Sequence, residues 1–182
     1  MFRIAYTILG LYGVWSCGLA AAQPRSAPAP PSGVKTIIVV RHAEADATEH
    51  GGDPVLTADG RARALELARA LTDTPLRSVY TTHYQRGRQT AEPLPRRAGE
   101  KPTVIDKVAA TLDALRAEPW GATALVIGHS NTVPDLIRGL TGQALPDGEP
   151  IIFDRMWIVT MTRDGVASLL RLRYGAPVAI VK

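Results

Sequence analysis

The chain has 182 residues, a formal net charge of +4 and one cysteine, Cys17. A single cysteine excludes both an intramolecular disulfide and a thiolate metal site. The basic residues are spread along the chain with acidic residues between them. This pattern is compatible with an anionic substrate and does not indicate a nucleic-acid partner.

The N-terminus has the pattern of a secretory signal peptide, because Arg3 precedes an apolar run that ends in small residues. We expect cleavage after Ala22 and a secreted or periplasmic location. Two alternatives stay open. The apolar run of ~19 residues is long enough to remain as a membrane anchor, or Cys17 is lipidated. Without either of these, we expect no stable membrane insertion.

Residues 23–34 are rich in proline, alanine and serine and have no apolar periodicity, which indicates an extended linker. The folded domain is expected to cover residues 35–182, a length typical of one domain.

Strand and helix patterns alternate along residues 35–182, which predicts an α/β fold. Apolar runs predict buried strands at residues 37–40 and 124–127 and short strands at residues 78–81 and 103–105. Helical spacing predicts helices at residues 57–71, from 84 to Pro93, from 108 to 115 and from 133 to 140. The runs 157–161 and 168–174 flank Asp164-Gly165, which favours a hairpin. We therefore expect three layers, α/β/α, with a mostly parallel sheet and one antiparallel edge.

The predicted helix at residues 57–71 has Thr57 as its N-cap. Its apolar spacing comes from Ala64, Leu65, Ala68 and Leu71. The arginines at 61, 63, 69 and 77 alternate with acidic residues, which is typical of a solvated face. Gly142 is expected to end the last helix.

Two histidines come directly after predicted buried strands: Arg41-His42 follows residues 37–40, and Gly128-His129 follows residues 124–127. In an open α/β sheet, residues just beyond the carboxyl ends of the strands line the ligand crevice. A neutral imidazole is a nucleophile, and a guanidinium binds phosphate oxygens in a fork. We expect repulsion from Arg41 to keep His42 unprotonated. The pattern predicts a phosphate site, although each signal alone also fits an ordinary polar strand end.

A third arginine, Arg86, falls in the first turn of the helix that begins near residue 84, where backbone N–H groups favour anions. Arg88 points to the opposite side and is expected on the surface. Gly128 allows a close backbone approach before the last helix. Ser130, Asn131 or Thr132 is expected to cap that helix.

Taken together and in this order, Arg41-His42-Ala43, Arg86 with the following Gln89-Thr90-Ala91, and Gly128-His129 resemble the histidine phosphatase superfamily. This family is also called phosphoglycerate mutase-like. The phrase Leu56–Arg61 is similar to the family's helix entry after the nucleophile loop. The resemblance covers roughly residues 35–175.

The resemblance implies a phosphoglycerate mutase-like fold with His42 as the nucleophile that becomes phosphohistidine. It implies that Arg41, Arg86 and His129 bind the phosphoryl group. The implied activity is hydrolysis of a phosphomonoester or phosphoramidate on a small phosphorylated molecule, without metal or cofactor. The alternatives are a phosphoglycerate mutase-like phosphotransferase and a non-catalytic phosphate-binding module.

The general acid departs from the family pattern. Many members carry a glutamate in an insertion beside a Trp-Glu-Gly phrase, and this chain lacks that phrase between Arg86 and His129. We expect Asp106 as the proton donor, followed by Asp154 and Glu44 as candidates. Glu44 and His83 are also expected to contact substrate.

Overall fold

The computed structural model describes residues 33–46, 52–94 and 101–179. The predicted signal peptide, with Cys17 and Ala22, and residues 23–32 of the predicted linker lie outside these ranges. The first strand begins at Val34, the last residue assigned to the linker.

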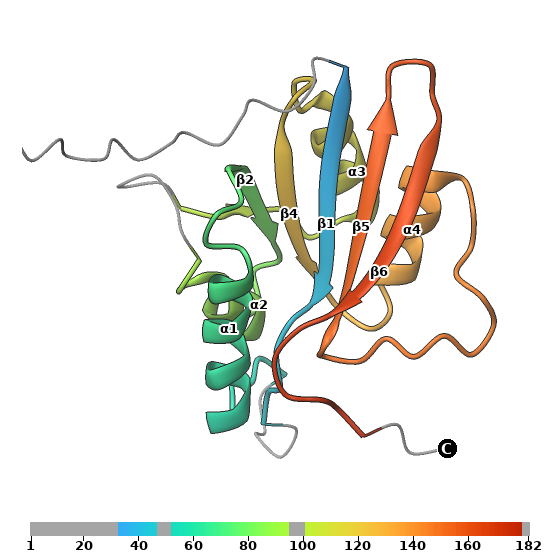
Figure 1. The fold of residues 1–182 in the computed structure, drawn as a ribbon. Coiled ribbons are helices and arrows are strands. Elements are labelled where there is room, and N and C mark those ends of the chain that lie inside the picture. The colour runs from blue at the N-terminus through green and yellow to red at the C-terminus, as the bar shows by residue number, and fades with distance from the viewer. Residues whose placement is uncertain (1–32, 47–51, 95–100, 180–182) are drawn as a thin grey trace, which may run out of the picture.

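The described strands form one six-stranded sheet in the order β3-β2-β4-β1-β5-β6 (Figure 1). The strands are β1 (Val34–Arg41), β2 (Leu76–Thr81), β3 (Thr103–Val104), β4 (Thr123–Gly128), β5 (Arg155–Thr162) and β6 (Ala167–Arg173). The first four are parallel, whereas β5 runs antiparallel to β1 and β6 antiparallel to β5. The predicted antiparallel edge is therefore confirmed, and Gly165 takes a φ of 86° in its hairpin turn.

Two helices cover each face of the sheet, which confirms the predicted three layers. Helices α1 (Ala58–Ala70) and α2 (Gln85–Ala91) cover one face, and α3 (Val108–Ala117) and α4 (Val133–Thr141) cover the other (Figure 1). Strand β1 is apolar throughout its centre because Ile37 and Val39 contact one helical layer while Ile38 and Val40 contact the other. Each such side chain, fully buried, contributes about 1.5–3 kcal/mol.

The structure confirms the predicted N-cap of α1 but differs from the prediction in which side chains of the helix are buried. The hydroxyl of Thr57 accepts a hydrogen bond from the N–H of Gly60 at 3.0 Å. Leu65 is 62% exposed, and the buried stripe runs through Ala64 and Leu67 instead. Arg63, expected on the solvated face, is only 6% exposed.

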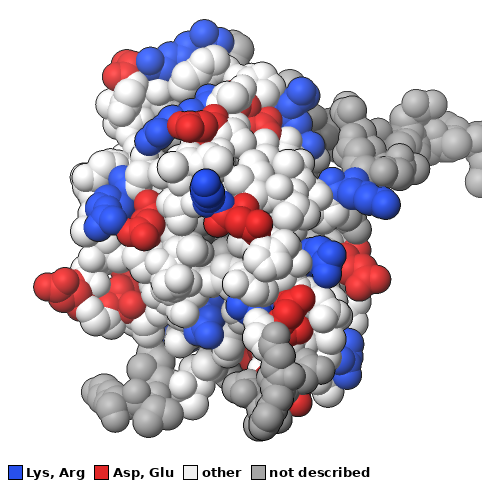
Figure 2. Space-filling view, turned by 180° about the vertical axis from the view of Figure 1, so that it is seen from behind, with Lys and Arg blue, Asp and Glu red and all other residues white. Residues whose placement is uncertain are grey.

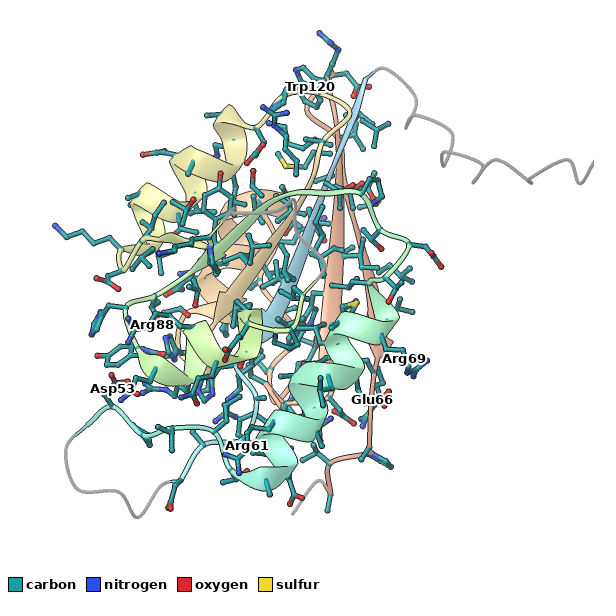
Figure 3. The ribbon with its side chains drawn as sticks, turned by 90° about the vertical axis from the view of Figure 1, so that its left-hand side faces the viewer. Asp53, Arg61, Glu66, Arg69, Arg88 and Trp120 are labelled. Carbon is teal, nitrogen blue, oxygen red and sulfur yellow. The ribbon has the colours of Figure 1, made fainter. Side chains whose placement is uncertain are left out.

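The other arginines of the expected solvated face do reach solvent. Arg61 and Arg69 are exposed along α1 (Figure 3), and Arg77 is more than half exposed. Seen from behind the view of Figure 1, acidic and basic side chains are interspersed on the surface (Figure 2). None of the helices in the described ranges has the length and hydropathy that a membrane crossing requires.

Helix α4 has the amphipathic pattern that its sequence predicted. Val133, Leu136, Ile137 and Leu140 are all buried, and Gly142 ends the helix with a φ of 73°. The carboxyl ends of β1, β2 and β4 all point to the lower edge of the sheet in Figure 1, so the residues that follow them meet there.

Candidate active site

The two predicted site histidines lie side by side beyond the ends of β1 and β4. The register pairs Arg41 with Gly128, and the N–H of His42 donates to the carbonyl of Gly128 at 2.9 Å. The parallel ladder thus continues one residue past β1. As a result, the ring centroids of His42 and His129 are 5.1 Å apart.

His42 is held in the form that a nucleophile needs. Its Nδ1 lies 2.7 Å from the carbonyl oxygen of Ala43. A carbonyl only accepts, so Nδ1 carries the hydrogen and Nε2 of the neutral ring keeps a free electron pair. Burial lowers the pKa of His42 to about 3, although the hydrogen bond to Ala43 opposes this shift.

The cause of this low pKa differs from the expectation that Arg41 would dominate. Desolvation is the largest cause, and repulsion from His129, Arg41 and Arg86 adds smaller contributions in that order. His42 is only 7% exposed, in keeping with desolvation as the main cause. At neutral pH, the His42 ring is therefore neutral.

Each of the two predicted phosphate-binding arginines stacks on an aromatic ring. The guanidinium carbon of Arg41 is 4.0 Å from the centroid of Phe153, and that of Arg86 is 4.2 Å from the centroid of Tyr84. Stacking fixes the guanidinium plane and leaves its N–H edge free to bind an oxyanion. Arg41 also donates from Nη1 to the carbonyl of Ile151 at 2.9 Å.

The two guanidinium groups lie near each other. Burial lowers the pKa of Arg41, the carboxylate of Glu44 opposes this, and the charge of Arg86 adds to the lowering. Arg86 has one distant acidic neighbour, with Nη1 3.9 Å from Oδ1 of Asp53. A bound anion would relieve the mutual repulsion of the arginines.

Three of the buried polar atoms without a hydrogen-bond partner in the described structure belong to the predicted phosphate ligands. They are Nε of Arg41, Nη1 of Arg86 and Nδ1 of His129. A buried polar group without a partner costs about 1–3 kcal/mol. These three nitrogen donors come from different segments of the chain, and all lack a hydrogen-bond acceptor. An oxyanion ligand would supply one.

His129 is positioned by two threonines. Its Nε2 lies 2.8 Å from Oγ1 of Thr82, and its backbone N–H donates to Oγ1 of Thr132 at 2.8 Å. Burial lowers the pKa of His129 to about 4, with repulsion from Arg86 and Arg41 as further causes.

The turn before α4 differs from its predicted form in one respect. Thr132 is at the N-cap position, but its hydroxyl binds His129 rather than the helix N–H groups. Ser130 and Asn131 are exposed. Gly128 is required as expected, because a Cβ there would lie 2.9 Å from Oγ1 of Thr132.

The residues Gln89 and Thr90 support the nucleophile loop from helix α2. Oγ1 of Thr90 accepts from the N–H of Ala43 at 3.0 Å, and Oε1 of Gln89 accepts from the N–H of Leu56 at 2.8 Å. The sequence suggested these positions only through the family resemblance. Arg88, between Arg86 and Gln89, is exposed on α2 as predicted (Figure 3).

Sequence reasoning missed Thr82, Tyr84 and Phe153. Tyr84 and Phe153 support the arginines, and Tyr84 also meets the ring of His129 edge-on at 5.3 Å. Tyr84 could have been found from its place two residues before Arg86. No sequence signal connects Phe153 with Arg41.

Two of the carboxylates considered as proton donors are engaged in ion pairs. Glu44 pairs with Arg63 at 2.7 Å, and Asp154, only 1% exposed, pairs with Arg173 at 2.8 Å. The structure thus gives both carboxylates structural partners. A substrate contact by Glu44 remains a prediction.

Asp106 does not fit the predicted role of proton donor. Its Oδ1 accepts from the backbone N–H of His83 at 2.9 Å and from the ring Nδ1 of His83 at 2.7 Å. These two hydrogen bonds, the backbone one first, lower the pKa of Asp106. At neutral pH it is therefore an ionised acceptor. His83 itself lies at the rim of the site with its side chain 55% exposed.

The described part of the chain contains no group of three or more His, Cys, Asp or Glu residues that could hold a metal ion. Positive charge in the site comes from Arg41 and Arg86.

Comparisons with known proteins concern the family and the fold. The model of the histidine phosphatase superfamily (branch 1) matches residues 37–108. A comparison with curated proteins gives no match.

Several solved structures share the fold. SixA from Nakamurella multipartitia is 24% identical with a TM-score of 0.60, and the match covers 80% of this chain and 99% of that one. The protein histidine phosphatase SixA complexed with tungstate is 20% identical with a TM-score of 0.60, covering 76% and 96%. Phosphoglycerate mutase from Plasmodium falciparum is 16% identical with a TM-score of 0.55, covering 82% and 98%. Residues 37–108 thus match the histidine phosphatase superfamily, and the chain shares the phosphoglycerate mutase-like fold of these solved structures.

Proposed function

We propose that this protein is a metal-independent phosphatase that hydrolyses a phosphomonoester or phosphoramidate through a phosphohistidine on His42, and that it acts after export. One observation carries the proposal. The free Nε2 of His42 is accompanied by buried nitrogen atoms of Arg41, Arg86 and His129 that have no hydrogen-bond partner in the described structure. The export rests on the sequence pattern of residues 1–22 alone.

The charges of substrate and site match. A phosphoryl group carries about −1.5 to −2 charges at neutral pH. Two guanidinium groups balance this charge, and His129 adds a hydrogen bond. For His129 to donate from Nδ1, the hydroxyl of Thr82 must donate to Nε2, which their 2.8 Å separation allows.

The reaction proceeds in two displacements. Nε2 of His42 attacks phosphorus, and the leaving group departs with the electron pair of its bond. Water then attacks the phosphohistidine, and the electron pair of the P–N bond returns to Nε2. Fixed donors aimed at the developing charge supply the main catalytic effect, about 10²–10³-fold for each donor.

The substrate class includes phosphoramidates for a structural reason. Asp106 and Glu44 both accept hydrogen bonds and so are poorly placed to protonate a difficult leaving group. The fold shared with the protein histidine phosphatase SixA also supports a substrate with a P–N bond.

The test measures phosphate release from p-nitrophenyl phosphate, an alkyl phosphate and phosphoimidazole, with native protein and with His42→Ala. We expect turnover by the native protein only, unaffected by a chelator and inhibited by tungstate. Rapid quenching in alkaline detergent with radiolabelled phosphoimidazole should trap base-stable, acid-labile phosphate on native protein and none on the variant.

Each alternative has a distinct outcome. Turnover that survives His42→Ala or is abolished by the chelator overturns the mechanism. Phosphate binding without turnover identifies a binding module. Transfer of the phosphoryl group to an added acceptor in preference to water identifies a phosphotransferase.

A further inference from the structure

His83 and Asp106 form a hydrogen-bonded pair at the carboxyl ends of two neighbouring parallel strands. His83 follows β2 and Asp106 follows β3, and the N–H of Ile105 donates to the carbonyl of Thr81 at 2.8 Å. This pairing brings Oδ1 of Asp106 within 2.7 Å of Nδ1 of His83. The position of the imidazole is therefore set by the sheet.

The pair leaves one nitrogen of His83 available for proton transfer. An ionised carboxylate only accepts, so Nδ1 of His83 carries a hydrogen. Among the described residues, none forms a hydrogen bond with Nε2 of His83. An imidazole whose Nδ1–H is oriented by a carboxylate is the arrangement of an acid–base catalyst.

The ring of Tyr84 lies between His83 and the predicted phosphate ligands. Its ring centroid is 4.0 Å from that of Tyr84, which in turn contacts His129 and Arg86. The residue before His83 is Thr82, which binds the ring of His129. The inference places the leaving group over the exposed rim that His83 occupies.

We propose that Nε2 of His83 is the acid–base catalyst of this site, with Asp106 as its positioning residue. The inference rests on the proposed phosphatase function. It also explains what replaces the missing carboxylic acid, since Asp106 acts through His83 rather than by donating its own proton.

The protons balance over the two displacements. In the first, Nε2 of His42 bonds to phosphorus, the bond from phosphorus to the leaving atom breaks, and protonated His83 gives its Nε2 proton to that atom. In the second, water attacks phosphorus, neutral His83 takes a proton from this water, and the P–N bond breaks toward His42. Inorganic phosphate leaves and His83 is protonated again.

The test compares native protein with His83→Gln and Asp106→Asn on two leaving groups. With an alkyl phosphate, we expect His83→Gln to lower kcat by about 10²-fold, because the alkoxide needs a proton. With p-nitrophenyl phosphate, whose leaving group needs little protonation, the variant should release nitrophenol in a burst equal to the enzyme concentration. Turnover after the burst should be slow, because the variant lacks the base that deprotonates the attacking water. Phosphoenzyme should therefore accumulate.

Two further measurements separate chemistry from structure. Added imidazole should restore turnover of His83→Gly toward the native rate, which no purely structural role explains. Asp106→Asn should show the same leaving-group pattern with a smaller loss, about tenfold. The matched control is Arg88→Gln, an exposed side chain on α2, which should leave both rates unchanged.

The outcomes are distinguishable. If His83→Gln keeps native rates on both substrates, or slows both equally without a burst or imidazole rescue, the inference is overturned and the phosphatase proposal stands. If native protein never forms phosphoenzyme on His42, the proposed function fails first, and the inference fails with it.

Discussion

Arg63 holds both carboxylate oxygens of Glu44, two residues beyond His42. Nε of Arg63 lies 2.9 Å from Oε1 and from Oε2, and Nη2 lies 2.7 Å from Oε1. Nη1 of Arg63 donates to the carbonyls of Tyr174 and Ala176 at 3.3 and 2.9 Å. One buried guanidinium thus joins the nucleophile loop, helix α1 and the segment after β6.

This network predicts a large stability loss for Arg63→Met. The substitution leaves Glu44 without its cation and two carbonyls without their donor, and breaking a buried ion pair costs about 3–5 kcal/mol. We expect a loss of about 3 kcal/mol, because Glu44 retains partial exposure. Urea denaturation followed by circular dichroism measures the difference.

Arg69→Met provides the control on the same helix. Arg69 pairs with Glu66 at 2.7 Å, but the arginine side chain is 73% exposed. Exposed pairs contribute about 0–1 kcal/mol. Equal losses for the two variants would contradict a special role for the buried pair.

The contrast between Arg63 and Leu65 shows what the sequence of α1 could and could not predict. The helix and its Thr57 cap follow from local spacing and side-chain chemistry. Which face of α1 is buried depends also on Glu44, which lies outside the helix. The carboxylate of Glu44 pairs with Arg63 and makes the burial of this arginine possible. Helical spacing alone favoured leucine over arginine as the buried residue and was wrong.

The same division applies to the site. His42 and His129 could be placed because each follows an apolar strand, and parallel strands end at one edge. The partners that hold the ligands depend on loop conformation: Phe153 reaches Arg41 from a segment beyond α4. The pairing of Asp106 with His83 was also inaccessible, because the two residues follow different strands and meet only in the folded sheet.

Arg86→Ala should abolish most of the activity, whereas Arg88→Ala should not. Arg86 supplies to the site a buried nitrogen without a hydrogen-bond partner, and Arg88 is exposed on the same helix. Removing one fixed donor lowers kcat/KM by about 10²–10³-fold. Steady-state kinetics on p-nitrophenyl phosphate compares them. Similar losses in both variants would indicate damage to α2 rather than loss of a phosphate ligand.

Thr82→Val should weaken phosphate binding without unfolding the protein. The hydroxyl that fixes the ring of His129 is lost, while valine keeps a similar volume. Loss of one hydrogen bond costs about 0.5–1.5 kcal/mol, so inhibition by inorganic phosphate should weaken roughly 2- to 13-fold. Thr82→Ser retains the hydroxyl and should bind phosphate like the native protein. A serine variant as weak as the valine variant would contradict this role.

The two buried site histidines should make the fold sensitive to mild acid. Their pKa values, about 3 for His42 and about 4 for His129, lie below the ordinary 6.5. Between pH 6.5 and 4, the unfolded chain therefore binds protons at these positions and the folded chain does not. The free energy of unfolding consequently falls as pH is lowered through this window, and the contribution is fully retained above pH 6.5. Urea denaturation at pH 7.5, 6.0 and 5.0 should show a smaller decline in the double variant His42→Gln/His129→Gln than in the native protein, with pH 7.5 as the reference. Identical declines would mean that neither ring is kept neutral by burial, and the basis for a free nucleophile at Nε2 of His42 would be lost.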